Sequence, residues 1–187
     1  VCSPGEELRR VPPAERDRFL MEDVLWLEKA QEQHRSFVRA LETMMRAGPG
    51  GAGAEVVDLR VELGRALHAL SGEEVARELI ERVGKLDPAL RGSELDAVLH
   101  TLRELLDTRD PRLVDHLIGG MLVPNLHPGG PLFRVGPSPN VLFARDYQFV
   151  LGGAAFISSM AKPVRRKEPT LSRFVFEAAL GLRDVTV

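Results

Sequence analysis

The sequence predicts a mainly α-helical protein, in which a long N-terminal helix packs on an antiparallel helical array and a Pro- and Gly-rich region can hold a short β-hairpin. Apolar residues recur at helical spacing through most of residues 13–122. Aromatic residues make up only 5% of the chain, whereas sheets favour aromatic and β-branched side chains. The segments between the helical patterns are short, and short connections place neighbouring helices antiparallel.

The composition is that of an ordinary globular protein. The chain has 187 residues, of which 44% are hydrophobic and 28% are charged, which is enough for one core. We therefore expect three regions that together form one compact domain: residues 1–47, residues 54–122 and residues 123–187.

Cysteine usage and hydropathy bear on where the protein works. The single cysteine, Cys2, excludes an internal disulfide, and no signal peptide is recognisable, so an intracellular setting, cytoplasmic or nuclear, is favoured. The chain does not begin with Met and can be a fragment of a longer protein. Its most apolar run, residues 147–161, is interrupted by two glycines and is too short to cross a membrane.

The N-terminal region carries the clearest helical pattern, and no Gly or Pro falls between Pro13 and Gly48. The pattern predicts one helix from about residue 13 to about residue 46, with Pro13 tolerated in the first turn. Such a helix would be roughly 50 Å long beside a globule about 40 Å across. It must therefore kink, or project and be covered by another chain. Its seam alternates steps of four and three residues: Leu20, Val24, Leu27, Gln31, His34, Val38, Leu41 and Met45.

We expect this helix to be a contact surface between chains, either in a homo-oligomer or with a helix of another protein. An exposed apolar stripe of this size is seldom tolerated by a soluble monomer. The alternative is that the helix is the central strut of its own domain, with its aromatic residues in the core and a half-buried histidine at its edge. The expected interface consists of Trp26, Leu27, His34, Phe37, Val38, Leu41 and Met44.

Residues 54–122 contain four shorter helical patterns. Ser71 with Glu74 predicts a capping box, and Ser93 and Asp110 predict two further N-caps. The spacing of these caps is uneven, and no signature of a helical-repeat family is present. The Gly-rich segment 47–54 before the array predicts a flexible turn or linker. The predicted core of the array includes Leu63, Leu67, Leu79, Val83, Leu99, Leu102 and Leu117.

The third region begins with a Pro- and Gly-rich connection, residues 123–140, that cannot be helical. Residues 132–135 and 141–144 flank the sequence GPSPN and permit a short hairpin. Residues 146–160 are predicted to form a buried helix, because they are apolar nearly all round. A final amphipathic helix is expected over residues 170–182, and the chain end is expected to fray.

Charge is distributed unevenly. Residues 54–122 carry 14 acidic and 9 basic side chains, and residues 123–187 carry 4 acidic and 8 basic. One interpretation is that the basic region packs on the acidic array. The other is that a basic loop faces an anionic partner or serves as a nuclear-import signal. Nucleic acid is disfavoured as that partner, because no aromatic residue is interleaved with the basic ones. The basic loop contains Lys162, Arg165, Arg166 and Lys167.

Two short patterns could carry chemistry. Ser159 and Lys162 have the spacing by which a lysine assists a serine nucleophile, but the accompanying S-D-N and K-T-G motifs are missing. Asp96, His100 and Glu104 share one helical face and could hold a metal ion, but no H-E-x-x-H motif or cysteine cluster supports this. Since no Walker A sequence is present either, we assign no catalytic residue, metal or cofactor.

Three classes of function remain open. The first, which we favour over an enzyme, is a non-catalytic interaction or scaffold module in a larger assembly. The second is an anion- or nucleic-acid-associated factor that uses the basic loop over residues 162–167. The third is an enzyme whose site is assembled from polar residues in the 123–160 region.

Overall fold

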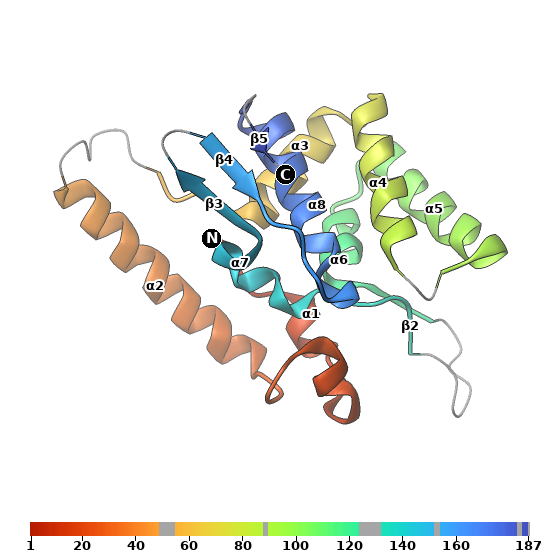
Figure 1. Ribbon diagram of the computed structural model, residues 1–187, viewed down its shortest axis with the longest axis horizontal. Coiled ribbons are helices and arrows are strands. Elements are labelled where there is room, and N and C mark those ends of the chain that lie inside the picture. Colours follow the sequence, from red (N-terminus) through yellow and green to blue (C-terminus); the bar gives the residue numbers. More distant parts are fainter. Residues whose placement is uncertain (49–54, 88–89, 124–131, 152–153, 183–184, 187) are drawn as a thin grey trace.

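The computed structural model describes residues 1–48, 55–87, 90–123, 132–151, 154–182 and 185–186. It is mostly helical, with 63% helix and 8% strand, and this confirms the predicted fold class. The helix α2 (Leu27–Ala47) extends along one edge of the molecule (Figure 1). Residues 49–54 of the predicted linker, residues 124–131 of the Pro- and Gly-rich connection and part of the chain end lie outside the described residues.

The N-terminal region is not one helix. It contains α1 (Glu6–Arg9), the 3-10 helix η1 (Pro13–Phe19), a non-helical stretch and then α2. The predicted continuous helix over residues 13–46 is therefore wrong. With 21 residues, α2 is roughly 32 Å long. Of the two alternatives for an overlong helix, the chain takes the first and changes direction.

The change of direction at Leu20 has a cause in packing. Leu20 takes a left-handed conformation with φ of 57°, and its N–H donates to the carbonyl of Asp17 at 3.1 Å. Phe19 and Met21 on either side are both buried. Residues two apart do not share a face of an α-helix, so burying both requires the chain to leave the helical path. They join a small second core with Leu8, Val11, Leu27 and Phe133.

The helical array follows the prediction closely. Its helices are α3 (Leu59–Ala69), α4 (Glu74–Leu86), α5 (Gly92–Asp107) and α6 (Arg112–Gly119). Every residue of its predicted core is buried: Leu63, Leu67, Leu79, Val83, Leu99, Leu102 and Leu117.

The caps of the array agree with the prediction only in part. Asp110 accepts a hydrogen bond from the backbone N–H of Arg112 at 2.8 Å, but the N-cap of α6 is Pro111, so Asp110 lies one position ahead of the cap. The capping box is wrong, because α4 begins without a side-chain cap and the Ser71 hydroxyl instead accepts from Nε of Arg109 at 3.1 Å. Ser93 is not a cap either, since α5 already begins at Gly92.

The predicted buried helix over residues 146–160 is wrong. After the short helix α7 (Ala144–Tyr147), this segment forms the antiparallel strands β3 (Gln148–Leu151) and β4 (Ala154–Ile157). The strand β5 (Val185–Thr186) pairs parallel with β4. A short apolar run without a clear period fits a buried helix and a strand equally well, so the pattern could not decide between them.

The remaining segments also differ from the expected pairing. The strand β2 (Phe133–Val135) pairs antiparallel with β1 (Met121–Leu122) rather than with residues 141–144. Those residues lie in the 3-10 helix η3 (Pro139–Leu142) and in α7. The last helix begins earlier than predicted: η4 (Pro163–Arg165) leads into α8 (Lys167–Phe174), which continues as the π-helical turn η5 (Val175–Ala179).

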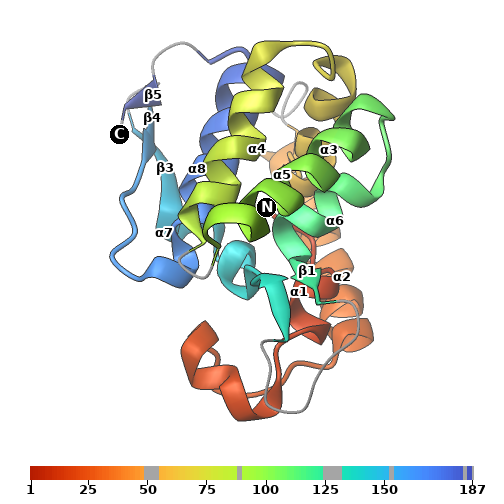
Figure 2. The same ribbon diagram turned by 90° about the vertical axis from the view of Figure 1, so that its right-hand side faces the viewer.

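The helix α8 joins the helical array to the sheet. It contacts α3 and α4 on one side and α7 and β4 on the other. Figure 2 shows α8 beside α4, with β3 beyond it. The predicted exposed basic loop therefore lies at a junction between elements. No helix in the described part of the chain is long and apolar enough to cross a membrane.

Candidate functional site

Four polar residues from four separate segments meet beside the start of α8. They are Asn140 of η3, Asp146 of α7, Arg165 of η4 and Glu168 of α8, and we call them the Arg165 cluster. The helices η3 and η4 both begin with proline, whose fixed φ suits the first turn of a helix. Short turns of defined geometry thus bring residues from distant parts of the chain together.

Arg165 is the centre of the cluster. Its Nε and Nη2 lie 2.9 Å and 2.8 Å from Oε2 of Glu168, and its Nη1 lies 2.8 Å from Oδ2 of Asp146. Nη2 also reaches the carbonyl of Asn140 at 3.5 Å. Burial lowers the pKa of Arg165, but the hydrogen bonds to Glu168 and Asp146 outweigh burial, so the pKa is raised overall. The guanidinium is therefore held charged between two acids.

Glu168 forms the buried end of the cluster. Its side chain is fully buried, and its Oε1 has no hydrogen-bond partner among the residues that are described. Burial raises the pKa of Glu168 to about 7, although the Arg165 guanidinium lowers it. A carboxyl group whose pKa lies near neutrality is typical of functional sites, although structural ion pairs can show the same shift.

Asp146 forms the open end. Its side chain is 48% exposed, against 12% for Arg165. The neighbouring Phe143 is also exposed, so an apolar ring lies near the carboxylate in the sequence and faces solvent. The cluster is thus a row of charges that runs from the interior to the surface, and the surface end is an acid.

Buried hydrogen bonds fix the segment that carries the cluster. Nδ2 of Asn140 donates to the carbonyl of Phe19 at 2.7 Å, which ties η3 to the N-terminal region. The hydroxyl of Tyr147 donates to the carbonyl of Val141 at 2.8 Å. Burial raises the pKa of Tyr147, so this hydroxyl keeps its proton. These two hydrogen bonds hold the segment that carries Asp146 in place without a ligand.

This arrangement is suited to binding a cation with several N–H donors. A carboxylate accepts two parallel hydrogen bonds from a guanidinium, and such pairs are strong and directional. Oδ2 of Asp146 already accepts one N–H of a guanidinium, and within the described chain no residue donates to its Oδ1. A metal site is a weaker reading, because the described residues contain no group of three or more His, Cys, Asp or Glu placed to hold a metal ion.

The structure divides the predicted basic loop into two pairs. Lys162 and Arg166 are exposed, as expected. Arg165 belongs to the cluster, and Lys167 is 95% buried at the start of α8. The prediction of one exposed basic surface is therefore wrong. The charge of Asp87, at the end of α4, acts on Lys167, which agrees with the alternative in which the basic region packs on the acidic array. Both acids that bind Arg165 belong to the basic region itself and do not support it.

The two faint catalytic patterns gain no support. Ser159 and Lys162 are exposed in a segment that does not begin a helix, so the serine lacks the setting that such a pair needs. Asp96, His100 and Glu104 are exposed on α5. They share a face as expected but do not form a metal-binding group.

The expected interface on α2 is split between solvent and the protein's own core. Trp26, Phe37 and Met44 are exposed, with Trp26 at 72%. Leu27 is buried in the second core, and His34, Val38 and Leu41 are partly buried. His34 lies with Nε2 3.9 Å from Oδ2 of Asp58, and burial lowers its pKa. Association of two chains through α2 is not tested by these positions and stays a prediction.

The sequence reasoning did not single out Asn140, Asp146 or Glu168. A signal for two of them was present, because residues 123–187 contain only 4 acidic side chains and two of these are Asp146 and Glu168. Each of these two acids lies close to an arginine in the sequence, Asp146 after Arg145 and Glu168 three residues after Arg165. Acids that are scarce in a basic region could have been treated as candidate partners of its arginines. No sequence pattern available here would have identified Asn140.

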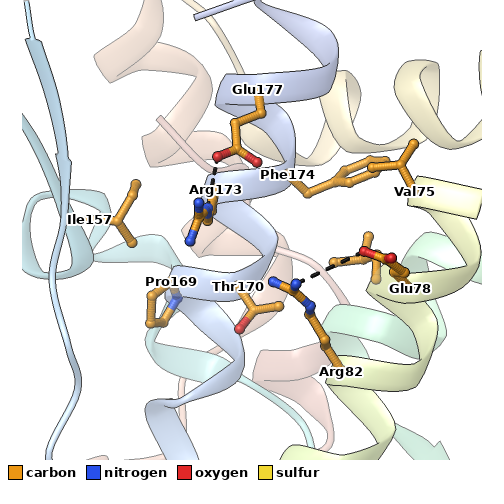
Figure 3. Close-up of a pocket in the computed structure, with 10 residues that line it drawn as sticks. Val75, Glu78, Arg82, Ile157, Pro169, Thr170, Arg173, Phe174 and Glu177 are labelled. Carbon is orange, nitrogen blue, oxygen red and sulfur yellow. Dashed lines mark hydrogen bonds and ion pairs between the residues drawn. The ribbon is translucent and has the colours of Figure 1, made fainter. Parts of the chain in front are cut away.

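Apart from the Arg165 cluster, a pocket of about 240 Å³ lies between α4, α8 and β4 (Figure 3). Its charged residues pair along their own helices, Arg82 with Glu78 at 3.9 Å and Arg173 with Glu177 at 2.8 Å. All four are at least partly exposed, so the pocket offers no buried ionisable group. It is a weaker candidate than the Arg165 cluster.

Comparison with known proteins gives one consistent result. A family model described as "Arginine deiminase" matches residues 17–180. The chain is 33% identical over 187 residues to the arginine deiminase of Rhodococcus opacus strain B4, and 30% identical over 190 residues to that of Mycobacterium tuberculosis strain H37Rv. Each match covers 92% of this chain but only 42% or 43% of the relative. The chain thus spans about two fifths of the length of these curated relatives.

The matched family and the relatives carry the name of an enzyme. The prediction of a non-catalytic scaffold or interaction module is therefore wrong, and so is the preference against an enzyme. The anion- or nucleic-acid-associated factor is overturned by the same finding. The general composition and the amphipathic helices, on which the scaffold prediction depended, are shared by many enzymes and could not separate the two classes.

Proposed function

Because this chain belongs to the arginine deiminase family, we propose that it forms part of an enzyme that hydrolyses the guanidinium group of arginine. In this reaction water adds to the guanidinium carbon, one C–N bond breaks, and nitrogen leaves as ammonia. The remaining carbon keeps the oxygen, so that a ureido group replaces the guanidinium. The protein must hold a planar cation in place while its carbon is attacked.

Asp146 is the residue that we assign to this cation. It is the half-exposed acid of the Arg165 cluster, and it already accepts a hydrogen bond from a guanidinium at 2.8 Å. This observation carries the proposal, because a substrate guanidinium has the same donors and charge as the side chain of Arg165. Arg165 and Glu168 act as positioning residues, since they hold Asp146 from the buried side.

The single cysteine of the chain is not in a reactive form. Cys2 is 1% exposed, and burial raises the pKa of its thiol to about 12, so the thiolate is absent at neutral pH. The chain also covers only 42% of the length of the Rhodococcus opacus relative. We infer that this chain contributes substrate binding through Asp146.

Titration of the purified chain with four ligands tests this function. Isothermal calorimetry would compare arginine, agmatine, citrulline and ornithine. Arginine and agmatine share the guanidinium, citrulline carries the neutral ureido group, and ornithine lacks both. We expect saturable binding of arginine and agmatine, and at least about tenfold weaker binding of citrulline, because it loses the ionic hydrogen bonds to Asp146.

The outcomes are distinct. Equal binding of citrulline and arginine, or no saturable binding of arginine, would exclude Asp146 as the guanidinium ligand. A colorimetric assay would detect ammonia and a ureido product formed from arginine. Their formation would extend the proposal from binding to hydrolysis.

A further inference from the structure

A cavity of about 340 Å³ lies on another side of the segment that carries Arg165. It is bounded by η1, the end of α4, the loop after β2, and the segment from residue 162 to the start of α8. Its volume falls within the range of small-molecule pockets. The proposed binding of arginine by Asp146 does not use this cavity, since neither Asp146 nor Glu168 lines it.

The cavity has mostly apolar walls with one deeply buried cation. The apolar lining includes Phe19, Leu20, Leu86, Pro137 and Val164. Lys167 also lines it and is only 5% exposed. Its ammonium donates to the carbonyl of Gly136. An ammonium has three N–H donors, and among the described residues Gly136 is the one acceptor in contact with it.

Burying an ammonium with donors to spare is unfavourable unless an anion compensates it. Asp87, at the end of α4, contributes part of that compensation through its charge. Its Oδ2 also accepts a hydrogen bond from the N–H of Gly136 at 2.9 Å. The backbone of Gly136 thus binds Asp87 through its N–H and Lys167 through its carbonyl.

The charged groups around the cavity favour an anionic ligand. Arg18 and Lys162 line it together with Lys167, against the single acid Asp87. The charge of Glu168 also acts on Lys167, but Glu168 forms an ion pair with Arg165. Arg18 forms an ion pair with Glu15 at 2.8 Å. Even with these pairs, Lys167 and Lys162 leave an excess of positive charge on the lining.

We propose that this cavity binds a small monocarboxylate with a short apolar chain, whose carboxylate pairs with Lys167 while its chain lies against Phe19, Leu86 and Val164. A single buried ammonium suits a single negative charge. A doubly charged phosphate would meet the repulsion of Asp87 and would lose more hydration in the apolar part of the cavity. Burial lowers the pKa of Lys167 to about 8, so the ammonium is still mainly protonated at neutral pH.

Calorimetry and NMR titration of the whole chain with butyrate, butyramide and inorganic phosphate test the proposal. Butyrate should bind with one-to-one saturation, and the isosteric neutral butyramide should bind at least about tenfold more weakly, since it cannot form the ionic hydrogen bond. Butyrate binding should weaken as pH rises above about 8, when Lys167 loses its proton. Equal binding of butyramide would overturn the proposal, and tighter binding of phosphate would overturn the ligand class.

Two variants address the site from different sides. Lys167→Met should abolish butyrate binding, and Lys29→Met on the exposed face of α2 is the matched control. Val164→Phe keeps the ammonium but fills the cavity, and it should also abolish binding. If Lys167→Met does not fold, Val164→Phe decides alone. Unchanged butyrate affinity in a folded Lys167→Met or Val164→Phe variant would contradict the proposal.

The variant Asp146→Asn distinguishes butyrate binding in this cavity from the proposed binding of arginine. This variant should retain butyrate binding, because Asp146 does not line the cavity. Loss of butyrate binding in Asp146→Asn would show that the observed signal came from the Arg165 cluster and would overturn the assignment to Lys167.

Discussion

Arg165 and Asp146, 19 residues apart in the chain, are joined by a hydrogen bond of 2.8 Å from Nη1 to Oδ2. The same guanidinium is bound through Nε and Nη2 to the fully buried Glu168. A change at any of the three residues should therefore affect the other two, and the direction of each effect follows from burial.

Replacing Arg165 by Met should strongly destabilise the protein. At about pH 8, Glu168 would be left as a buried carboxylate without its partner, and loss of one member of a buried pair costs about 3 to 5 kcal/mol. Urea denaturation would measure the change in the free energy of unfolding. The matched control is Arg112→Met, whose ion pair with Asp110 is exposed to solvent and should contribute far less to stability. Similar losses for both variants would mean that Arg165 does not compensate a buried charge.

Glu168→Gln should change how stability depends on pH. Burial raises the pKa of Glu168 from 4.5 to about 7, so the folded protein prefers the protonated carboxyl group. The stability that this preference contributes is fully present below about pH 4.5 and is lost as pH rises through about pH 7. The difference in unfolding free energy between wild type and Glu168→Gln should therefore shift by on the order of 2 to 3 kcal/mol across this window, in favour of the variant at high pH.

Urea denaturation at about pH 4.5, 6 and 7.5 would show this shift. Because the other titrating groups are shared by the two proteins, their contributions cancel in the difference. Parallel stability curves for wild type and Glu168→Gln would mean that Glu168 titrates as an ordinary exposed acid.

The packing of α4 on α5 gives a third prediction. Leu99 is buried, and Leu99→Ala should cost about 2 to 5 kcal/mol. A Cβ on Gly84 would lie 2.8 Å from Cδ2 of Leu99, so Gly84→Ala should also destabilise, by about 1 to 3 kcal/mol. In the Leu99→Ala background the contact with Cδ2 is gone and only that with Cδ1 of Leu95 at 3.2 Å remains, so Gly84→Ala should destabilise less than it does in the wild type.

Thermal and urea unfolding of the two single variants and the double variant would complete the cycle. Gly64→Ala in α3 is the control, because the nearest atom to its added Cβ is Val114 Cγ2 at an acceptable 3.4 Å. Additive effects of Leu99→Ala and Gly84→Ala would contradict the close approach of α4 to α5.

The helical array could be predicted because its local pattern and its burial agree. Leu63, Leu99 and Leu117 recur at helical spacing, and each is buried. The N-terminal region shows where such reasoning fails. The pattern continues through Leu20 without Gly or Pro, yet the contact of Phe19 with Phe133, 6.1 Å between ring centroids, bends the chain there. Contacts between residues more than a hundred positions apart are not visible in a local period.

The candidate site was beyond sequence reasoning for a related reason. The sequence predicts Arg165 only as one of four cations in an exposed basic loop. Its two acids come from different elements, and only the folding of η4 against α7 and α8 brings Asp146 and Glu168 to it. A charged run in a sequence does not indicate which of its members turn inward, and here Lys162 and Lys167 take opposite positions.

The last prediction concerns Asp146, on which the proposed function depends. Asp146→Asn keeps the shape of the side chain but removes its charge, so arginine should bind about 10- to 100-fold more weakly, the range expected for a hydrogen bond to a charged group. Stability should change by no more than about 1 kcal/mol, because the pair is partly exposed and Arg165 keeps Glu168 as a partner. Calorimetric titration with arginine and urea denaturation measure the two effects.

Asp110→Asn is the matched control for this variant, since Asp110 also pairs with an arginine, Arg112, but belongs to the helical array. It should bind arginine as the wild type does. Asp146→Glu should recover part of the affinity, because the charge returns on a longer side chain. If Asp146→Asn and Asp110→Asn bind arginine equally well, the guanidinium is held elsewhere. If Asp146→Asn unfolds the protein, then Asp146→Glu, which keeps the charge next to Arg165, decides between a structural and a ligand-binding role by its affinity for arginine.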